Sequence, residues 1–328
     1  MRTSRLCPPG RQFHHVMSRA VSGTPRFTPS DKERFRRLMR AYETFCGVRV
    51  LTYAVMGTHF HILLEVPERE ELTEQEVVRR MRAIYTEGQV RERLAQWAEW
   101  RREGGEARVE RELDELRGRM YDLSQYMKTL KQRFTQWYNR CHQRRGTLWE
   151  QRFKSVLVEG RPQTLVCMGA YIDLNPLRAG ICRDPKDYRW CGFAEAVAGD
   201  ARAQDGVRRL YAATLPDLSW EALCGTYRMV LFEKGEKGGP VAFSSERVRQ
   251  ILAQNGCLSR FDLLRCRVRY FTDGLVLGSE EFVDAIVAGH RDYFSAKRRK
   301  GACRMKFTNL DGLFVARALR LEAVSPPD

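Results

Sequence analysis

The stretch VRVLTYAVMGTHFHILLEVP, residues 48–67, decides how this chain folds. Its two halves are rich in β-branched and aromatic side chains, which favour strands, and only a short connection around Gly57 and Thr58 separates them. We therefore predict two strands, residues 48–56 and 60–67, that pair as an antiparallel hairpin.

The second of these strands has an apolar face and a polar face. Side chains alternate along a strand, which puts the even-numbered apolar residues from Phe60 to Val66 toward the core and His59 and His61 on the other side. The two imidazoles are then about 7 Å apart along the strand, close enough to converge on one metal ion. Ordinary packing would explain the pair as well, so spacing alone leaves both interpretations open. Glu65 lies about 13 Å beyond His61 and is a poor third ligand.

Charge and composition narrow the class of partner. The chain has 328 residues and a formal net charge of +16, which favours a polyanion, and nucleic acid fits better than an anionic membrane surface. No apolar run approaches the roughly 20 residues of a membrane span, and the first residues lack the apolar core of a secretion signal. We expect a cytoplasmic protein. Ten cysteines without a C-x-x-C pair indicate reduced thiols and no zinc site.

Further elements can be read on either side of the hairpin. Strand character returns at residues 11–22 and 146–159, and helical patterns cover residues 31–45, 123–146 and 162–175. The order strand, helix, strand, strand, helix, strand matches the ferredoxin-like split βαβ arrangement of an α+β protein. Because its helices cover one face of the antiparallel sheet, we expect the other face to be open for a site.

Two domains are predicted. Residues 1–200 form the catalytic domain, interrupted at residues 70–119 by a charged helical insertion. Residues 201–328 form a mainly helical region for which DNA binding is one option. The segments GDARAQDG (199–206) and KGEKGGP (234–240) read as linkers, and helices are expected at residues 244–256 and 279–287. The basic cluster at residues 297–300 is either a solvated helix end or a phosphate contact.

The helix at residues 162–175 carries a polar stripe beside its apolar one. Tyr171 and Asn175 are four residues apart and therefore neighbours on this stripe. An asparagine before proline also ends helices, and a tyrosine at a helix edge also packs in cores, so both plainer interpretations remain at this point.

Several of these segments together resemble the REP-associated tyrosine transposases, within the HUH single-tyrosine transposases and endonucleases. The resemblance covers roughly residues 10–195. It is carried by His59-Phe60-His61, which resembles the HUH signature, and by HHVMSRA (14–20), GTLWEQRFKS (146–155) and AYIDLNPLRAGIC (170–182). The insertion at residues 70–119 is longer than in the shortest members of this family. The residues after 200 are not matched to any part of the family.

The resemblance implies a nuclease that binds one divalent ion, opens a single DNA strand next to a hairpin and holds the 5′ phosphate on tyrosine. Position by position, His59 and His61 match the metal-binding pair, Tyr171 the nucleophile and Asn175 the residue that completes the metal site. Imidazole and amide ligands suit Mn²⁺ or Mg²⁺, whereas zinc is disfavoured without cysteine ligands. Attack by tyrosine conserves bond energy in the phosphotyrosine, so strand transfer as well as cleavage becomes possible.

Other residues compete for these roles or add to them. A free phenol ionises only near pH ~10, so the nucleophile requires nearby positive charge or a base, which the sequence does not identify. Of the two neighbouring histidines near the N-terminus, His14 and His15, at most one can approach the site, and packing is expected for both. The rival nucleophiles are Tyr121, Tyr126 and Tyr138.

A basic helix and the segment after it are predicted to contact DNA. Single-strand grooves interleave cations and aromatic rings, as this region does. The same aromatics on an ordinary amphipathic helix would lie in the core. The predicted DNA contacts are Arg133, Trp137, Tyr138, Arg140, Arg144, Arg145, Trp149, Arg152 and Lys154.

Two other functions remain open. A domesticated DNA- or RNA-binding protein of the same fold would use the same charges without turnover, and a hydrolase of small phosphoesters would use the same ligands. The first leaves four intact catalytic-type residues unused, and the second leaves the charge of +16 unused. A homodimer is compatible with the sequence, which does not determine the oligomeric state.

Overall fold

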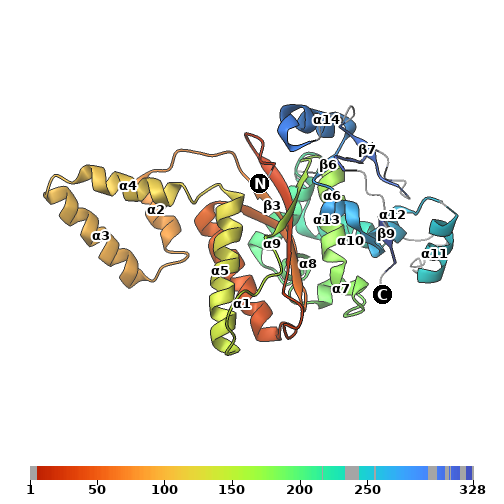
Figure 1. Cartoon of the computed structure of the whole chain (residues 1–328), viewed down its shortest axis with the longest axis horizontal. Coiled ribbons are helices and arrows are strands. Elements are labelled where there is room, and N and C mark those ends of the chain that lie inside the picture. Colours follow the sequence, from red (N-terminus) through yellow and green to blue (C-terminus); the bar gives the residue numbers. More distant parts are fainter. Residues whose placement is uncertain are drawn as a thin grey trace.

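The computed structural model describes residues 6–215, 217–232, 244–254, 256–294, 301–306, 310, 312–317 and 323–326. Within these residues the chain forms a seven-stranded sheet with helices on both sides (Figure 1). The strand order is β2-β3-β1-β4-β6-β8-β7, and of these neighbouring pairs only β4–β6 is parallel. The chain is thus a mixed α/β protein with a mostly antiparallel sheet, consistent with the predicted α+β class.

The N-terminal half contains the predicted order of elements. The 146–159 segment differs from the prediction, because it becomes a strand only at Lys154. Before that, the Trp149 Nε1 donates a hydrogen bond to the Thr135 Oγ1 at 3.0 Å, which holds the segment against the basic helix. The elements are β1 Gln12–Arg19, α1 Pro29–Cys46, β2 Arg49–Val55, β3 His59–Val66, α5 Leu123–Cys141 and β4 Lys154–Val158.

The side chains of β3 point to the two faces of the sheet that their alternation predicts, but helices cover both faces. Phe60 and Ile62 lie in the core beneath α1 and α5, and the ring of Phe60 is 4.7 Å from that of Phe35, centroid to centroid. On the other face, Leu63 lies in a second core beneath α6 Pro162–Asp173. The prediction of an open face is therefore wrong: helices cover both sides of the sheet (Figure 1). The site has to lie at an edge of this covered face.

Helix α6 lies in the interior of the protein and is buried along most of its length. Every residue from Thr164 to Asp173 is buried. The Asp173 carboxylate accepts hydrogen bonds from Thr52 Oγ1 at 2.6 Å and Tyr227 Oη at 2.7 Å, which ties α6 to β2 and to α10 Trp220–Leu231. These contacts fix the helix that carries Tyr171.

Most of the segment predicted as a linker at residues 199–206 is helical. It forms the start of α9 Ala201–Tyr211, capped by the Asp200 side chain, which accepts from the backbone amides of Arg202 and Ala203. Gly206 lets the helix press against the edge strand β2: a Cβ at this position would lie 2.4 Å from the Leu51 carbonyl oxygen. Glycine and aspartate are typical of linkers, but here Asp200 caps a helix and Gly206 permits its close packing on β2.

This contact predicts a stability effect. Gly206→Ala is expected to lower the free energy of unfolding by about 2–3 kcal/mol, because the methyl group meets backbone that cannot move independently. Gly225→Ala in α10 is the matched control: its Cβ meets nothing within 4 Å, and the change should raise stability by about 0.5–1 kcal/mol. Urea unfolding curves measure both, and equal effects of the two changes would contradict the packing argument.

The C-terminal region is built into the same sheet and core. Its strands β6 and β8 continue the sheet beyond β4, and one core cluster runs from Leu51 to Val324. This core cluster takes side chains from both sides of residue 200. The region's remaining elements are α11 Ser245–Ala253, α12 Arg260–Arg265, β5 Arg267–Val268, α13 Arg269–Asp273, β6 Val276–Gly278, α14 Glu280–Gly289, β7 Cys303–Arg304, β8 Phe314–Val315 and β9 Val324–Ser325.

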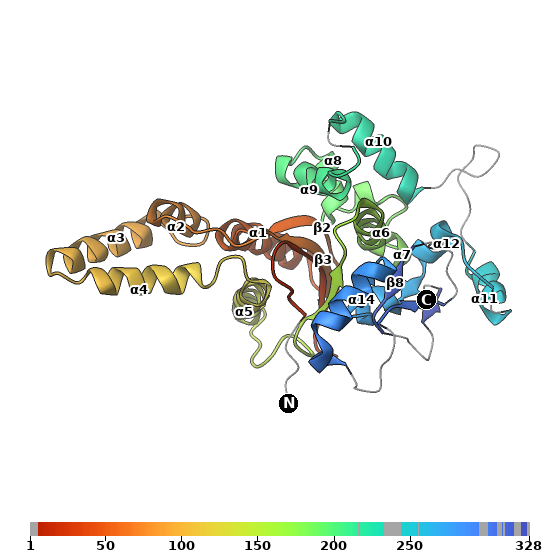
Figure 2. The same cartoon turned by 90° about the horizontal axis from the view of Figure 1, so that it is seen from above.

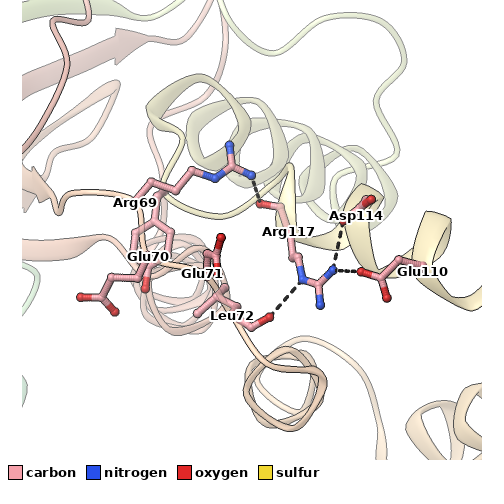
Figure 3. Close-up of a pocket in the computed structure, with 8 residues that line it drawn as sticks. Arg69, Glu70, Glu71, Leu72, Glu110, Asp114 and Arg117 are labelled. Atoms are coloured by element: carbon pink, nitrogen blue, oxygen red, sulfur yellow. Dashed lines mark hydrogen bonds and ion pairs between the residues drawn. The ribbon is translucent and has the colours of Figure 1, made fainter.

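The predicted insertion is helical and projects from the body of the molecule (Figure 2). Its elements are α2 Glu74–Met81, α3 Glu87–Arg102 and α4 Glu106–Arg117, and the last two form a hairpin with Trp97 buried in it. Arg117 closes its base: its Nε donates to the Leu72 carbonyl at 3.1 Å, and its guanidinium also pairs with Asp114 and Glu110 (Figure 3).

Two predicted features fall on residues that are not described, namely the segment 234–240 and the basic cluster at residues 297–300. The helices expected at residues 244–256 and 279–287 correspond to α11 and α14. In the described part of the chain, no helix has the length and apolarity needed to cross a membrane.

Candidate active site

A cavity of about 590 Å³ lies where the end of β1, the start of β3 and the end of α6 meet the segment β5–α13. His59, His61, Tyr171 and Asn175 all line it. Cations dominate the rest of its polar lining, and no carboxylate is among the described residues that line it. Its cationic residues are Arg19, Arg26, Lys154, Arg178, Arg267 and Arg269.

The histidine pair opens β3. His59 and His61 lie on one face of the strand with ring centroids 5.2 Å apart, nearly perpendicular to each other. The His59 Nδ1 lies 3.2 Å from the Thr58 Oγ1, and His61 is only 3% exposed. The expected face and proximity of the two rings are both present.

Tyr171 reaches the same cavity from α6. Its ring centroid lies 6.5 Å from that of His61, and its residue is 4% exposed. The phenol and the two imidazoles, which are more than 100 residues apart in sequence, are therefore brought together around one cavity. This is the spatial convergence on which the sequence interpretation depends.

Asn175 lies at the end of this helix and begins the short helix α7 Asn175–Arg178. Its Nδ2 donates to the backbone carbonyls of Ile172 at 3.0 Å and Tyr171 at 3.4 Å. The side chain thus caps the helix, as the plainer interpretation has it, and also lines the cavity. Because the amide nitrogen makes these bonds, the amide oxygen is the atom that can serve as a ligand.

Arg178 is a site residue that the sequence interpretation missed. Its Cζ lies 4.1 Å from the centroid of the Tyr171 ring, and its guanidinium donates to the Tyr171 carbonyl at 2.7 Å and the Leu264 carbonyl at 2.6 Å. Burial lowers the pKa of Arg178, while Tyr171 acts in the opposite direction. One feature of the sequence could have identified Arg178. It follows Tyr171 by seven residues, which is two helical turns, within the segment 170–182.

His15 was also missed, since packing was expected for it. It is buried, and its Nε2 lies 2.9 Å from the His61 Nδ1, while its Nδ1 lies 2.7 Å from the Phe271 carbonyl oxygen. On β1, the partner of Met17 across the sheet is His61, so His15 is a diagonal neighbour of His61. His14 points to the opposite face, as its position next to His15 requires.

All three imidazoles at the site are held neutral. Burial lowers the pKa of His15 to about 4 and that of His59 to about 3, and it places the pKa of His61 well below its ordinary value. Nearby Arg178 lowers the pKa of each further. Neutral imidazoles are the form that binds metal ions.

Two imidazoles and an amide oxygen are the kinds of ligand that a divalent ion such as Mn²⁺ or Mg²⁺ accepts. Among the described residues, no group of three or more His, Cys, Asp or Glu side chains is arranged to hold a metal, so a third protein ligand would have to be an amide. The Asn175 oxygen meets that requirement together with His59 and His61. The many cations nearby oppose a bound cation, and a phosphate in the cavity would offset them.

The pKa of His15 predicts how stability depends on pH. Between pH 6.5, where an unfolded histidine titrates, and about 4, the unfolded chain binds more protons than the folded one, so falling pH favours unfolding. Burial raises the pKa of Asp173 to about 6, which acts in the opposite sense, so only a comparison with a variant isolates His15. We expect His15→Gln to reduce the slope of unfolding free energy against pH by about 1 kcal/mol per unit. Metal-free urea titrations from about pH 4.5 to 6 measure it, and parallel curves would contradict it.

The predicted DNA contacts do not form one groove. Only Lys154 lines the cavity, where its Nζ pairs with Asp273 at 2.6 Å, and Arg152 lies beside it in an adjoining hollow. Tyr138 and Trp149 are buried in the core beneath α5, so neither offers a ring for stacking. Arg133, Trp137 and Arg140 line a separate cavity between α1, α5 and the insertion, and Arg144 and Arg145 follow α5 in a loop.

The rival nucleophiles lie away from the histidine pair. Tyr126 is buried, with its hydroxyl 3.4 Å from the Met39 carbonyl oxygen. The Tyr121 hydroxyl accepts a hydrogen bond from Arg80 at 2.6 Å. With Tyr138, both pack with the core on the α1 and α5 side of the sheet, whereas His61 is on the other side. Of the four tyrosines considered, Tyr171 is the one that lines the cavity.

Comparison with known protein families and with curated proteins found no match. Among solved structures, the chain is similar to a REP-associated tyrosine transposase bound to a REP hairpin, with a TM-score of 0.37 and 13% sequence identity. The similarity covers 61% of this chain and 87% of that chain.

Proposed function

We propose that this protein is a metal-dependent single-strand DNA endonuclease and transposase that cleaves and rejoins hairpin-containing DNA through a 5′-phosphotyrosine. The observation that carries the proposal is the meeting of Tyr171 with His59 and His61 in a cavity lined by cations. A phenol beside a ligand pair suits covalent phosphoryl transfer, and the cations suit a polyanionic substrate. The resemblance of residues 10–195 to REP-associated tyrosine transposases supports a hairpin substrate.

In the proposed reaction the Tyr171 oxygen attacks the phosphorus of a single strand. The bond from phosphorus to the 3′ oxygen breaks, the 3′ oxygen leaves as a hydroxyl with the proton that the phenol loses, and the 5′ phosphate stays on tyrosine. Arg178 lies against the ring and donates a hydrogen bond to the Tyr171 carbonyl, which holds the phenol in place for attack. The reverse attack by a 3′ hydroxyl rejoins strands without an external energy source.

The remaining residues bind and orient the substrate. His59, His61 and the Asn175 oxygen would hold the divalent ion, which when bound withdraws charge from the phosphate oxygens. The surrounding arginines would attract and hold the neighbouring phosphates of the strand. Burial of the Tyr171 ring between Arg178 and Phe271 limits its motion before attack.

The test is formation of a covalent adduct. Purified protein is incubated with labelled single-stranded hairpin DNA and Mn²⁺ or Mg²⁺, denatured, and separated by gel electrophoresis. We expect a DNA–protein band that requires the metal and disappears in His59→Ala and His61→Ala variants. Retained DNA binding with no adduct under any metal would favour the alternative, a DNA- or RNA-binding protein without turnover. Hydrolysis of small phosphoesters alone would favour the hydrolase.

A further inference from the structure

The C-terminal region contacts the candidate active site through the segment at residues 264–273. The Leu264 carbonyl accepts from Arg178, and the Phe271 carbonyl oxygen lies 2.7 Å from His15 Nδ1. The ring of Phe271 packs edge-on against Tyr171 with centroids 4.9 Å apart. Three residues of the site thus depend on backbone or ring contacts from this segment.

We propose that this segment sets the proton position on His61, with His15 as the positioning residue between them. The proposal rests on the proposed function, since it assigns how the metal-binding pair is prepared. It gives the region after residue 200 a defined part in the active site. It also explains why a third buried histidine stands beside the pair.

The proton positions follow from the Phe271 carbonyl. A carbonyl oxygen only accepts hydrogen bonds, so the hydrogen between it and His15 belongs to His15 Nδ1. A neutral imidazole carries one such hydrogen, which leaves His15 Nε2 as an acceptor. The 2.9 Å contact between His15 Nε2 and His61 Nδ1 then requires that His61 Nδ1 donates. The lone pair of His61 is consequently on Nε2.

This arrangement prepares His61 as a ligand. The nitrogen that faces His15 carries the proton, and the other nitrogen is available to an ion in the cavity that His61 lines. Metal-binding histidines commonly donate their second nitrogen to a neighbouring acceptor, which fixes the ring and raises its basicity. Here the acceptor is another imidazole, itself fixed by a carbonyl from the distant segment.

Burial makes the chain of hydrogen bonds rigid. His15 is 1% exposed and His61 is 3% exposed, and their ring planes are 20° apart with centroids 5.1 Å apart, which suits a hydrogen bond in the plane of both rings. Water cannot readily replace either partner at such positions. A simple packing role would be satisfied by any side chain of similar volume, whereas the proposed role needs an acceptor at the position of the His15 Nε2.

The experiment compares three variants of the full chain in Mn²⁺ binding by calorimetry. His15→Gln retains an acceptor near the Nε2 position, His15→Leu removes it at similar volume, and His14→Gln changes the neighbouring buried histidine on the opposite face. We expect His15→Leu to weaken Mn²⁺ binding by about 10- to 100-fold. The other two variants should stay within a few-fold of the wild type. Binding of single-stranded DNA without metal should be unchanged in all three.

A second measurement does not depend on metal or on a folded variant. Long-range ¹H–¹⁵N spectra of the wild-type imidazoles report which nitrogen carries the proton. We expect Nδ1 to be protonated in both His15 and His61, and a proton on the His61 Nε2 would overturn the proposal. Equal Mn²⁺ affinity of His15→Leu and wild type would overturn it as well. A wild type that binds Mn²⁺ with these effects but forms no adduct would instead reject the proposed function and leave the role of His15 intact.

Discussion

Tyr171→Phe is expected to abolish the covalent protein–DNA adduct while Mn²⁺ binding and single-stranded DNA binding remain. The change removes one oxygen from a ring that is 4% exposed and held between Arg178 and Phe271, so the cavity keeps its shape. Loss of a covalent nucleophile typically costs at least about 10⁴-fold in rate. The measurement is the initial rate of adduct formation on labelled hairpin DNA, with metal affinity determined on the same preparation.

Tyr126→Phe and Tyr138→Phe are the matched controls. Both residues are fully buried, and both lie with the core on the side of the sheet opposite to His61. Each variant should form the adduct at a rate within a few-fold of the wild type. An adduct that persists in Tyr171→Phe would assign the nucleophile to another residue, and a simultaneous loss of Mn²⁺ binding would indicate collapse of the cavity rather than loss of the nucleophile.

The part of the site that could be predicted from sequence follows local periodicity. Alternation along β3 was sufficient to place His59 and His61 on one face, since Phe60 and Ile62 require the other face for the core. The spacing of four residues between Tyr171 and Asn175 was sufficient to make them neighbours on a helix. That these two pairs meet around one cavity was expected only through the family resemblance.

The features of the site that the sequence did not predict depend on contacts between segments that are far apart in the chain. His15 reaches His61 through the register of β1 with β3, and the carbonyl that orients it comes from residue 271, so no local pattern carries this information. The covered face of the sheet was missed for the same reason. Trp149 was assigned to the wrong environment. Its position beside basic residues suggested that the ring stacks on DNA, but the ring is buried in the core beneath α5.

Arg178→Gln is expected to slow adduct formation at saturating DNA by roughly 10- to 100-fold. The guanidinium of Arg178 lies over the Tyr171 ring, Cζ to centroid 4.1 Å, and donates to the Tyr171 carbonyl at 2.7 Å, so the change frees the ring that has to attack. The measurement is the single-turnover adduct rate as a function of DNA concentration.

The dependence of the rate on DNA concentration separates positioning of Tyr171 from simple attraction of DNA. Arg19→Gln removes a cation that lines the same cavity, and we expect weaker DNA binding with an unchanged rate at saturating DNA. Arg178→Lys keeps the charge but loses the paired donation to the Tyr171 and Leu264 carbonyls, so its rate should fall between those of wild type and Arg178→Gln. If Arg178→Gln reaches the wild-type rate at saturating DNA, as Arg19→Gln should, Arg178 contributes only to the positive lining of the cavity. A lower rate that persists at saturating DNA would instead assign Arg178 to the positioning of Tyr171.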